Sequence, residues 1–120
     1  MRKTAISKNS LAQSSLKDSI YICNQIRDKP TTKAKSLLND LIEEKRSLSG
    51  RYYKTACREI LSVLENAEAN AESMGLSADK LFIKNAVAHK TFTFMLPKSR
   101  WSHRGKRSKL CKLEMIVEER

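Results

Sequence analysis

Apolar residues near the start of the chain recur at helical intervals and predict a first helix over residues 16–28. Ser15 followed by Asp18 has the spacing of a helix cap with an acidic residue at the third helical position. We expect Pro30 to end this segment, because proline cannot continue a helix. The repeating apolar positions are Leu16, Ile20, Cys23 and Ile26.

A second helix is expected after Pro30, with Thr31 or Thr32 as its cap and an end near Lys45. A short turn at residues 47–50 follows it, too short to link separate domains. The apolar face of this helix comprises Ala34, Leu37, Leu38, Leu41 and Ile42.

A third helix is expected over residues 53–74, where the helical pattern of apolar residues is longest and most regular. The length of this pattern predicts that the helix is the central one of the core. Residues 65–72 offer only alanines on the buried side, so we expect another backbone to approach closely there. Gly75 suits the left-handed position after a helix end. The apolar positions are Tyr53, Cys57, Ile60, Leu64, Ala67, Ala71 and Met74.

After Gly75 the period changes from helical to two residues, which predicts one long, bent strand over residues 81–97. A return strand is expected over residues 113–117, and residues 4–7 could form a further short strand. On one face of the long strand the pattern places Leu81, Ile83, Asn85 and Val87, and on the other Phe82, Lys84, Ala86 and Ala88.

The length of 120 residues, with 40% hydrophobic and 31% charged residues, indicates one folded domain over residues 1–120. The fold class is α+β. Because the chain has no apolar run of about 20 residues and no signal-peptide pattern, we expect a cytoplasmic protein without membrane insertion.

Positive charge is concentrated between the long strand and the return strand. The chain has 24 Lys and Arg against 13 Asp and Glu, and residues 98–112 supply seven of these cations and no acidic residue. Without local carboxylates such a run repels itself, so an anionic partner is expected. The seven residues, at the tip of a predicted hairpin, are Lys98, Arg100, Arg104, Lys106, Arg107, Lys109 and Lys112.

Folded RNA suits this run better than double-stranded DNA, because no recognition helix carries the basic residues and a long thin arm can insert between RNA segments. Arginine and lysine match phosphates, and Trp101 offers a ring for base stacking. Further candidate RNA-binding residues are His103, His89, Lys90, Lys8 and Lys17.

The sequence shows no set of catalytic residues, so no enzyme is expected. Three glycines cannot build the usual phosphate loop. Three cysteines without paired spacing and two histidines indicate neither a disulfide framework nor a metal site, and no cofactor is expected. Four acidic residues of the third helix are spaced for its solvent side: Glu59, Glu65, Glu68 and Glu72.

Several segments closely resemble the universal large-subunit ribosomal protein family numbered twenty-two, in its archaeal and eukaryotic form. The most specific is EILSVLENAEANAE at residues 59–72, followed by GL at 75–76 and LFIK at 81–84. Further similar segments are SIYICNQIR at 19–27, AHK at 88–90, MLP at 95–97 and LEMIVEE at 113–119.

This resemblance implies three helices packed on a three-stranded antiparallel sheet, with a long protruding β-hairpin over residues 86–112. It implies a structural role in the large ribosomal subunit, where the body and hairpin bind ribosomal RNA and the hairpin lines the exit tunnel. The implied partners are large-subunit ribosomal RNA, neighbouring large-subunit proteins and the nascent polypeptide.

Two features depart from the family pattern. The family usually has a longer basic, glycine-containing insertion before the third helix, whereas residues 47–52 are short here. The hairpin turn usually has glycine where this chain has Trp101, Ser102 and His103. Two alternatives stay open: a free-standing RNA-binding or DNA-binding regulatory protein, and a module that binds membrane surfaces or acidic proteins, although the tip lacks an apolar face.

Overall fold

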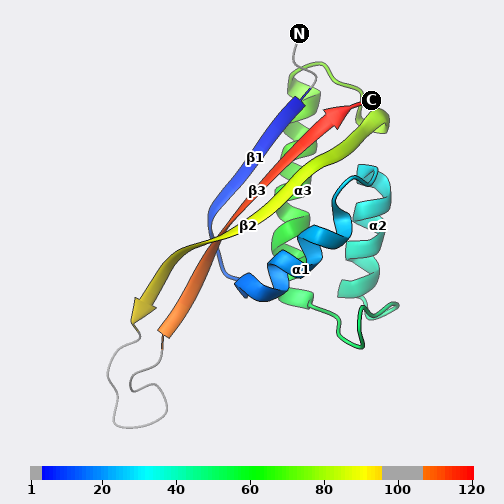
Figure 1. Cartoon of the computed structure of the whole chain (residues 1–120). Helices are drawn as coiled ribbons and strands as arrows, with labels where there is room; N and C mark the ends of the chain where they lie inside the picture. Colours follow the sequence, from blue (N-terminus) through cyan, green and yellow to red (C-terminus); the bar gives the residue numbers. More distant parts are fainter. Residues whose placement is uncertain (1–3, 96–106) are drawn as a thin grey trace, which may run out of the picture.

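The structure is a computed structural model that describes residues 4–95 and 107–120. In these residues the chain forms three strands and three α-helices. The strands form one antiparallel sheet in the order β1-β3-β2, and α3 packs along β1 and β3 while α1 packs against β2 (Figure 1). This confirms the predicted α+β class with three helices on a three-stranded antiparallel sheet. The elements are β1 Thr4–Ala12, α1 Leu16–Ile26, α2 Thr31–Ile42, α3 Lys54–Ser73, a 3-10 turn Ala78–Lys80, β2 Leu81–Met95 and β3 Arg107–Glu119.

Helix α1 begins as predicted, with the backbone N–H of Asp18 donating to Oγ of Ser15 at 3.5 Å. It ends at Ile26, two residues before the predicted end, because the backbone of Arg27 is extended and Asp28 is left-handed with φ of 64°. The N–H of Asp28 then donates to the carbonyl of Ile83 at 2.9 Å. The turn between α1 and α2 is therefore fixed to strand β2.

Helix α2 is capped differently from the prediction. Its N-cap is Pro30, whose carbonyl accepts the N–H of Ala34 at 3.0 Å, whereas Thr31 is a buried residue inside the helix. The expectation of a threonine cap was wrong, because the extended backbone of Pro30 already supplies the turn into the helix. The helix ends at Ile42 rather than near Lys45, and Glu44 has a positive φ of 61°.

Helix α3 is the central helix, as predicted, but its predicted face was too long. Tyr53 is its N-cap in a left-handed conformation, and Met74 follows its last residue and is 54% exposed. Ala67 and Ala71 are fully buried. Helix α3 contacts strand β1, and the side-chain amide of Asn70 donates to the carbonyl of Ile6 at 2.9 Å. The prediction that alanines form the buried side of this part of the helix is therefore confirmed.

Strands β1 and β3 are longer than predicted, β2 is described as far as Met95 of the predicted range 81–97, and the face that β2 buries changes along the strand. β1 continues to Ala12 and β3 begins at Arg107, six residues before the predicted start. In β2, Leu81 and Ile83 are buried, but a bulge between Ile83 and Asn85 turns Ala86 to the core. The prediction that Asn85 shares a face with Ile83 was therefore wrong.

One face of the sheet and the inner sides of the helices form a single hydrophobic core. Its largest fully buried side chains include Ile22, Ile26, Leu38, Leu41, Ile60, Leu64, Leu113 and Met115. Among the described residues, no helix has both the length and the apolar character that a bilayer crossing requires.

The sheet narrows to two strands at Cys111, where the pairing of β1 with β3 ends at Ala12. Beyond this point β2 and β3 pair with each other as far as Met95 and Arg107. Figure 1 shows these two strand ends extending away from the helices. We call residues 91–95 and 107–110 the hairpin arms.

Candidate nucleic-acid interface

The predicted RNA-binding residues fall into three groups. Arg107 and Lys109 belong to strand β3, at positions opposite Met95 and Thr93 in β2, so they lie on an arm rather than at a loop tip. Lys8, His89, Lys90, Lys112 and Lys17 have described side chains on the body. Outside the described residues lie Lys98, Arg100, Trp101, His103, Arg104 and Lys106.

Three of the predicted residues meet where the arms leave the body. Lys112 in β3 lies opposite His89 in β2, and Lys8 in β1 lies opposite Glu114 in β3. Oε1 of Glu114 is 3.0 Å from Nζ of Lys112 and 3.9 Å from Nζ of Lys8. We call these four residues the hairpin root.

Glu114 is an acidic side chain surrounded by cations. The hydrogen bond from Lys112 holds the pKa of the Glu114 carboxyl below its ordinary value, and the charges of Lys112, Lys8 and His89 act in the same direction. The expectation that the basic run has no nearby carboxylate was therefore wrong for Lys112. Residues two apart on a strand point to the same face, which brings Glu114 beside it.

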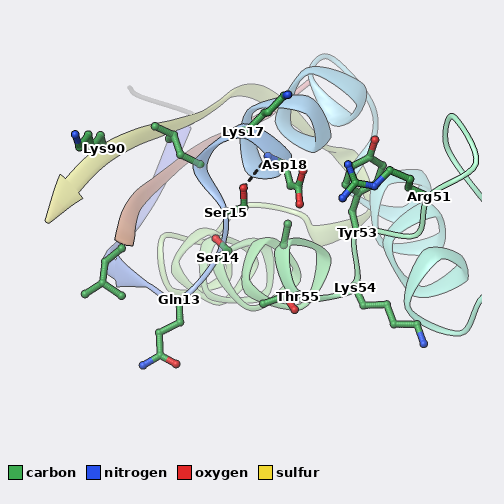
Figure 2. Close-up of a pocket in the computed structure, with 13 residues that line it drawn as sticks. Gln13, Ser14, Ser15, Lys17, Asp18, Arg51, Tyr53, Lys54, Thr55 and Lys90 are labelled. Carbon is green, nitrogen blue, oxygen red and sulfur yellow. Dashed lines mark hydrogen bonds between the residues drawn. The ribbon is translucent and has the colours of Figure 1, made fainter. Parts of the chain in front are cut away.

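Lys17 and Lys90, far apart in sequence, line the same groove, which has a volume of about 1060 Å³. Figure 2 shows how the end of β1, the start of α1, the start of α3 and strand β2 contribute to it. Among the described residues that line the groove, four are basic and one, Asp18, is acidic. The basic residues are Lys17, Arg51, Lys54 and Lys90.

Sequence reasoning did not select Arg51 or Lys54. The guanidinium of Arg51 lies over the ring of Tyr53, 5.1 Å from its centroid, and that ring packs against Tyr21 at 5.2 Å. Lys54 forms an ion pair with Glu44. The sequence signal that could have pointed to Arg51 is its position beside Tyr52 and Tyr53. The groove itself could not be foreseen, because it forms only when α1 and α3 pack together.

A buried polar cluster lies beside the groove. Oγ of Ser14 is 2.9 Å from Oγ of Ser19 and 3.1 Å from Sγ of Cys111, so hydrogen bonds join the segment after β1, helix α1 and strand β3. Burial raises the pKa of the thiols of Cys23 and Cys57 to about 11. These thiols are therefore protonated packing groups near neutral pH.

The comparison with protein families gives one match across nearly the whole chain. A family model described as ribosomal protein L22p/L17e matches residues 7–118. The matched range includes the hairpin root, the groove and both arms.

Three archaeal proteins named large ribosomal subunit protein uL22 illustrate the similarity. The protein of Methanopyrus kandleri is 38% identical over 58% of this chain, and this match spans little more than half of that protein, at 56%. The protein of Sulfurisphaera tokodaii is 34% identical over 73% of this chain and 75% of its own length. The protein of Methanococcus aeolicus is 31% identical over 98% of this chain and 90% of its own.

Proposed function

This chain belongs to the ribosomal protein L22p/L17e family, and we propose that it is a structural protein of the large ribosomal subunit that binds ribosomal RNA through its hairpin. The relatives at 34% and 31% identity carry the name of a large-subunit protein. A protein of the large subunit works in the cytoplasm, among ribosomal RNA and other ribosomal proteins. Its contribution is architectural, and no catalytic step is assigned to it.

The observation that carries the RNA assignment is the basic run in the sequence that connects strand β2 with strand β3. The arms extend beyond the helices, and residues 98–112 hold seven cations without an acidic residue. Seven like charges within 15 residues repel one another, and closely packed phosphates remove that repulsion. The arms alone would be marginally stable in water, so RNA enclosing them would also stabilise the hairpin.

The hairpin is also proposed to form part of the wall of the nascent-peptide exit tunnel. The arm of β2 from Thr91 to Met95 spans about 16 Å beyond the three-stranded sheet, at roughly 3.3 Å for each residue. An arm that leaves the body in this way can present its end to a growing polypeptide. The proposed partners are therefore large-subunit RNA, neighbouring large-subunit proteins and the nascent chain.

Salt dependence of binding tests the RNA assignment. If six or seven phosphates are neutralised, the logarithm of affinity for large-subunit ribosomal RNA should fall against the logarithm of salt concentration with a slope of about −4 to −6. A flat dependence would overturn the assignment. Strong preference for a short RNA or DNA sequence, together with absence from purified large subunits, would instead support a free-standing regulator.

A further inference from the structure

The two edges of the sheet are treated differently by the rest of the chain. Strand β3 lies in the centre, so β1 and β2 are the edge strands. An edge strand presents a row of backbone N–H and C=O groups, and folded proteins usually cover such a row or block it. The contacts at each edge therefore indicate which one is available to a partner.

The edge of β2 is closed by the turn between α1 and α2. The N–H of Asp28 donates to the carbonyl of Ile83 at 2.9 Å, and the N–H of Ile83 donates to the carbonyl of Lys29 at 2.9 Å. Further along the strand, Nη2 of Arg27 donates to the carbonyl of Ala86 at 2.8 Å. These bonds occupy outward-pointing groups of β2, so another strand has no place there.

Among the described residues, the edge of β1 is open at residues 4–8. Opposite residues of an antiparallel pair alternate between pairs that exchange hydrogen bonds and pairs whose N–H and C=O groups point outward. The carbonyl of Ile6 accepts the side-chain amide of Asn70 at 2.9 Å, so Ile6 belongs to an outward-pointing pair. By the same alternation, Thr4 and Lys8 also point outward. Within the described part of the chain, no hydrogen bond reaches the N–H of Ile6 or Lys8.

The helices leave this edge accessible. Helix α3 packs along β1 and β3, whereas α1 packs against β2 and lies with α2 on that side of the sheet (Figure 1). Ile6 and Lys8 are exposed. The outward N–H and C=O groups of β1 thus recur at every second residue, a spacing that matches the backbone of another extended chain.

The charges along this edge favour a polypeptide over RNA. Nζ of Lys8 is 3.9 Å from the carboxylate of Glu114, and Oε2 of Glu59 is 3.5 Å from the side-chain amide of Asn9. Two carboxylates thus accompany one lysine here, among the side chains that the structure describes. The edge lacks the excess of positive charge with which proteins bind phosphates.

Exposed apolar area beside the edge points in the same direction. Ile6 is 51% exposed and lies opposite Ile116 of β3, on the sheet face away from the core. Successive residues of a strand point to opposite faces, so the side chains on one side of an added strand would cover these isoleucines. Those on its other side would lie toward α3, where Asn70 is exposed. A segment that alternates apolar and polar residues fits both sides.

From these observations we infer that an extended segment of a neighbouring large-subunit protein pairs with β1 and adds a fourth strand to the sheet. Its N–H groups donate to the carbonyls of Thr4 and Lys8, and its carbonyls accept the N–H groups of Ile6 and Lys8. This inference rests on the proposed function, because it presumes assembly into the large subunit. It assigns a surface and a mode of binding to a protein partner.

Amide hydrogen exchange, read by mass spectrometry, measures this pairing. In the isolated chain, the N–H groups of Ile6 and Lys8 should exchange at least about tenfold faster than those of Ala5 and Ser7, which point toward β3. In purified large subunits, exchange at Ile6 and Lys8 should slow by at least about tenfold. Exchange that stays fast at both positions in the subunit would overturn the inference.

A photo-reactive side chain identifies the occupant of the edge. Ile6→photo-leucine carries a diazirine, which on illumination reacts with protein and RNA alike. In purified large subunits we expect a cross-link to a polypeptide segment that alternates apolar and polar residues. A cross-link to RNA alone, to a second copy of this chain, or to nothing would overturn the inference.

Proline separates the role of the backbone from that of the side chain. Ile6→Pro removes the outward N–H and breaks no bond of the ladder between β1 and β3, whereas Ile6→Ala removes the same side chain and keeps the N–H. When both variants compete for assembly, Ile6→Pro should enter large subunits about three- to tenfold less than Ile6→Ala. Equal entry would overturn the inference. If proline lowers the stability of the free chain, the exchange and cross-linking results decide alone.

The salt dependence of RNA binding distinguishes failure of this inference from failure of the proposed function. Ile6→Pro keeps every cation, so the free variant should bind large-subunit ribosomal RNA with the salt slope of the wild type. If that slope is found but Ile6 gains neither protection nor a cross-link to protein, the edge inference is wrong and the RNA assignment stands. If the unmodified chain shows no salt-dependent RNA binding and is absent from large subunits, both proposals fail.

Discussion

The carboxylate of Glu114 lies 3.0 Å from the ammonium of Lys112, two positions away on strand β3. This ion pair lies beside Cys111, where β1 ends its pairing and the sheet narrows to the two arms. Its position gives the hairpin root an acidic centre between Lys8 and Lys112. The root therefore offers RNA less free positive charge than the basic run beyond it.

The ion pair predicts a specific pH dependence of stability. Because Lys112 lowers the pKa of Glu114 in the folded chain, the stabilisation is present above the ordinary value of 4.5 and is lost as the pH falls through the folded value. Glu114→Gln should therefore have a lower urea midpoint than the wild type at pH 7, and this difference should shrink as the pH falls below 4.5. In a Lys112→Gln background, the difference at pH 7 should shrink. An undiminished difference there would contradict the assignment to Lys112.

The buried alanine face of α3 predicts intolerance of larger side chains. Ala71 is fully buried in the hydrophobic core, so Ala71→Leu should overpack its surroundings and lower the free energy of unfolding by about 1–3 kcal/mol. Ala69→Leu, on the exposed side of the same helix, should change it by less than about 0.5 kcal/mol. Chemical denaturation of both variants checks the difference, and equal effects would contradict close packing around Ala71.

The cysteines should react with thiol reagents only after unfolding. All three are free and buried, and burial raises the pKa of Cys23 and Cys57 to about 11. At pH 8 we expect negligible reaction with dithionitrobenzoate in the native chain and three reacting thiols in guanidinium chloride. Rapid reaction of the native chain would show that the helices open readily from the sheet.

The basic run should matter for assembly rather than for folding of the body. Substitution of Arg104, Lys106, Arg107 and Lys109 by Ser removes four cations from the basic run and no apolar side chain. We expect unchanged thermal unfolding and reduced incorporation into large subunits on a sucrose gradient. Normal incorporation of this variant would contradict the role of the hairpin.

Two signals in the sequence led to most of the predictions: the periodicity of apolar residues predicted the helices and strands, and the concentration of charge predicted an anionic partner. The existence, type and order of the three helices and three strands were predicted correctly, because apolar residues at fixed intervals must bury one face. The extents of β1 and β3 were underestimated. The resemblance to the ribosomal family is confirmed by the match over residues 7–118. Helix ends were less accurate, because the left-handed residues Asp28 and Glu44 give little signal in sequence.

Features made by tertiary contacts were not predictable. The bulge between Ile83 and Asn85 reverses the face of β2, and the alternating pattern of residue types did not reveal it. Arg51 and Lys17 line one groove only because α1 and α3 begin on the same side of the molecule. Lys112 looked unpaired in the basic run, but strand geometry brings Glu114 beside it.

The central position of β3 has a consequence for synthesis. β1 and β2 each form their ladders with β3, which follows both of them along the chain. While a ribosome synthesises this polypeptide, the helices can form their hydrogen bonds early. Strands β1 and β2 have no central strand to pair with until residues 107–119 have been added. Completion of the sheet, and with it the pairing of the two arms, is therefore a late step in folding during synthesis.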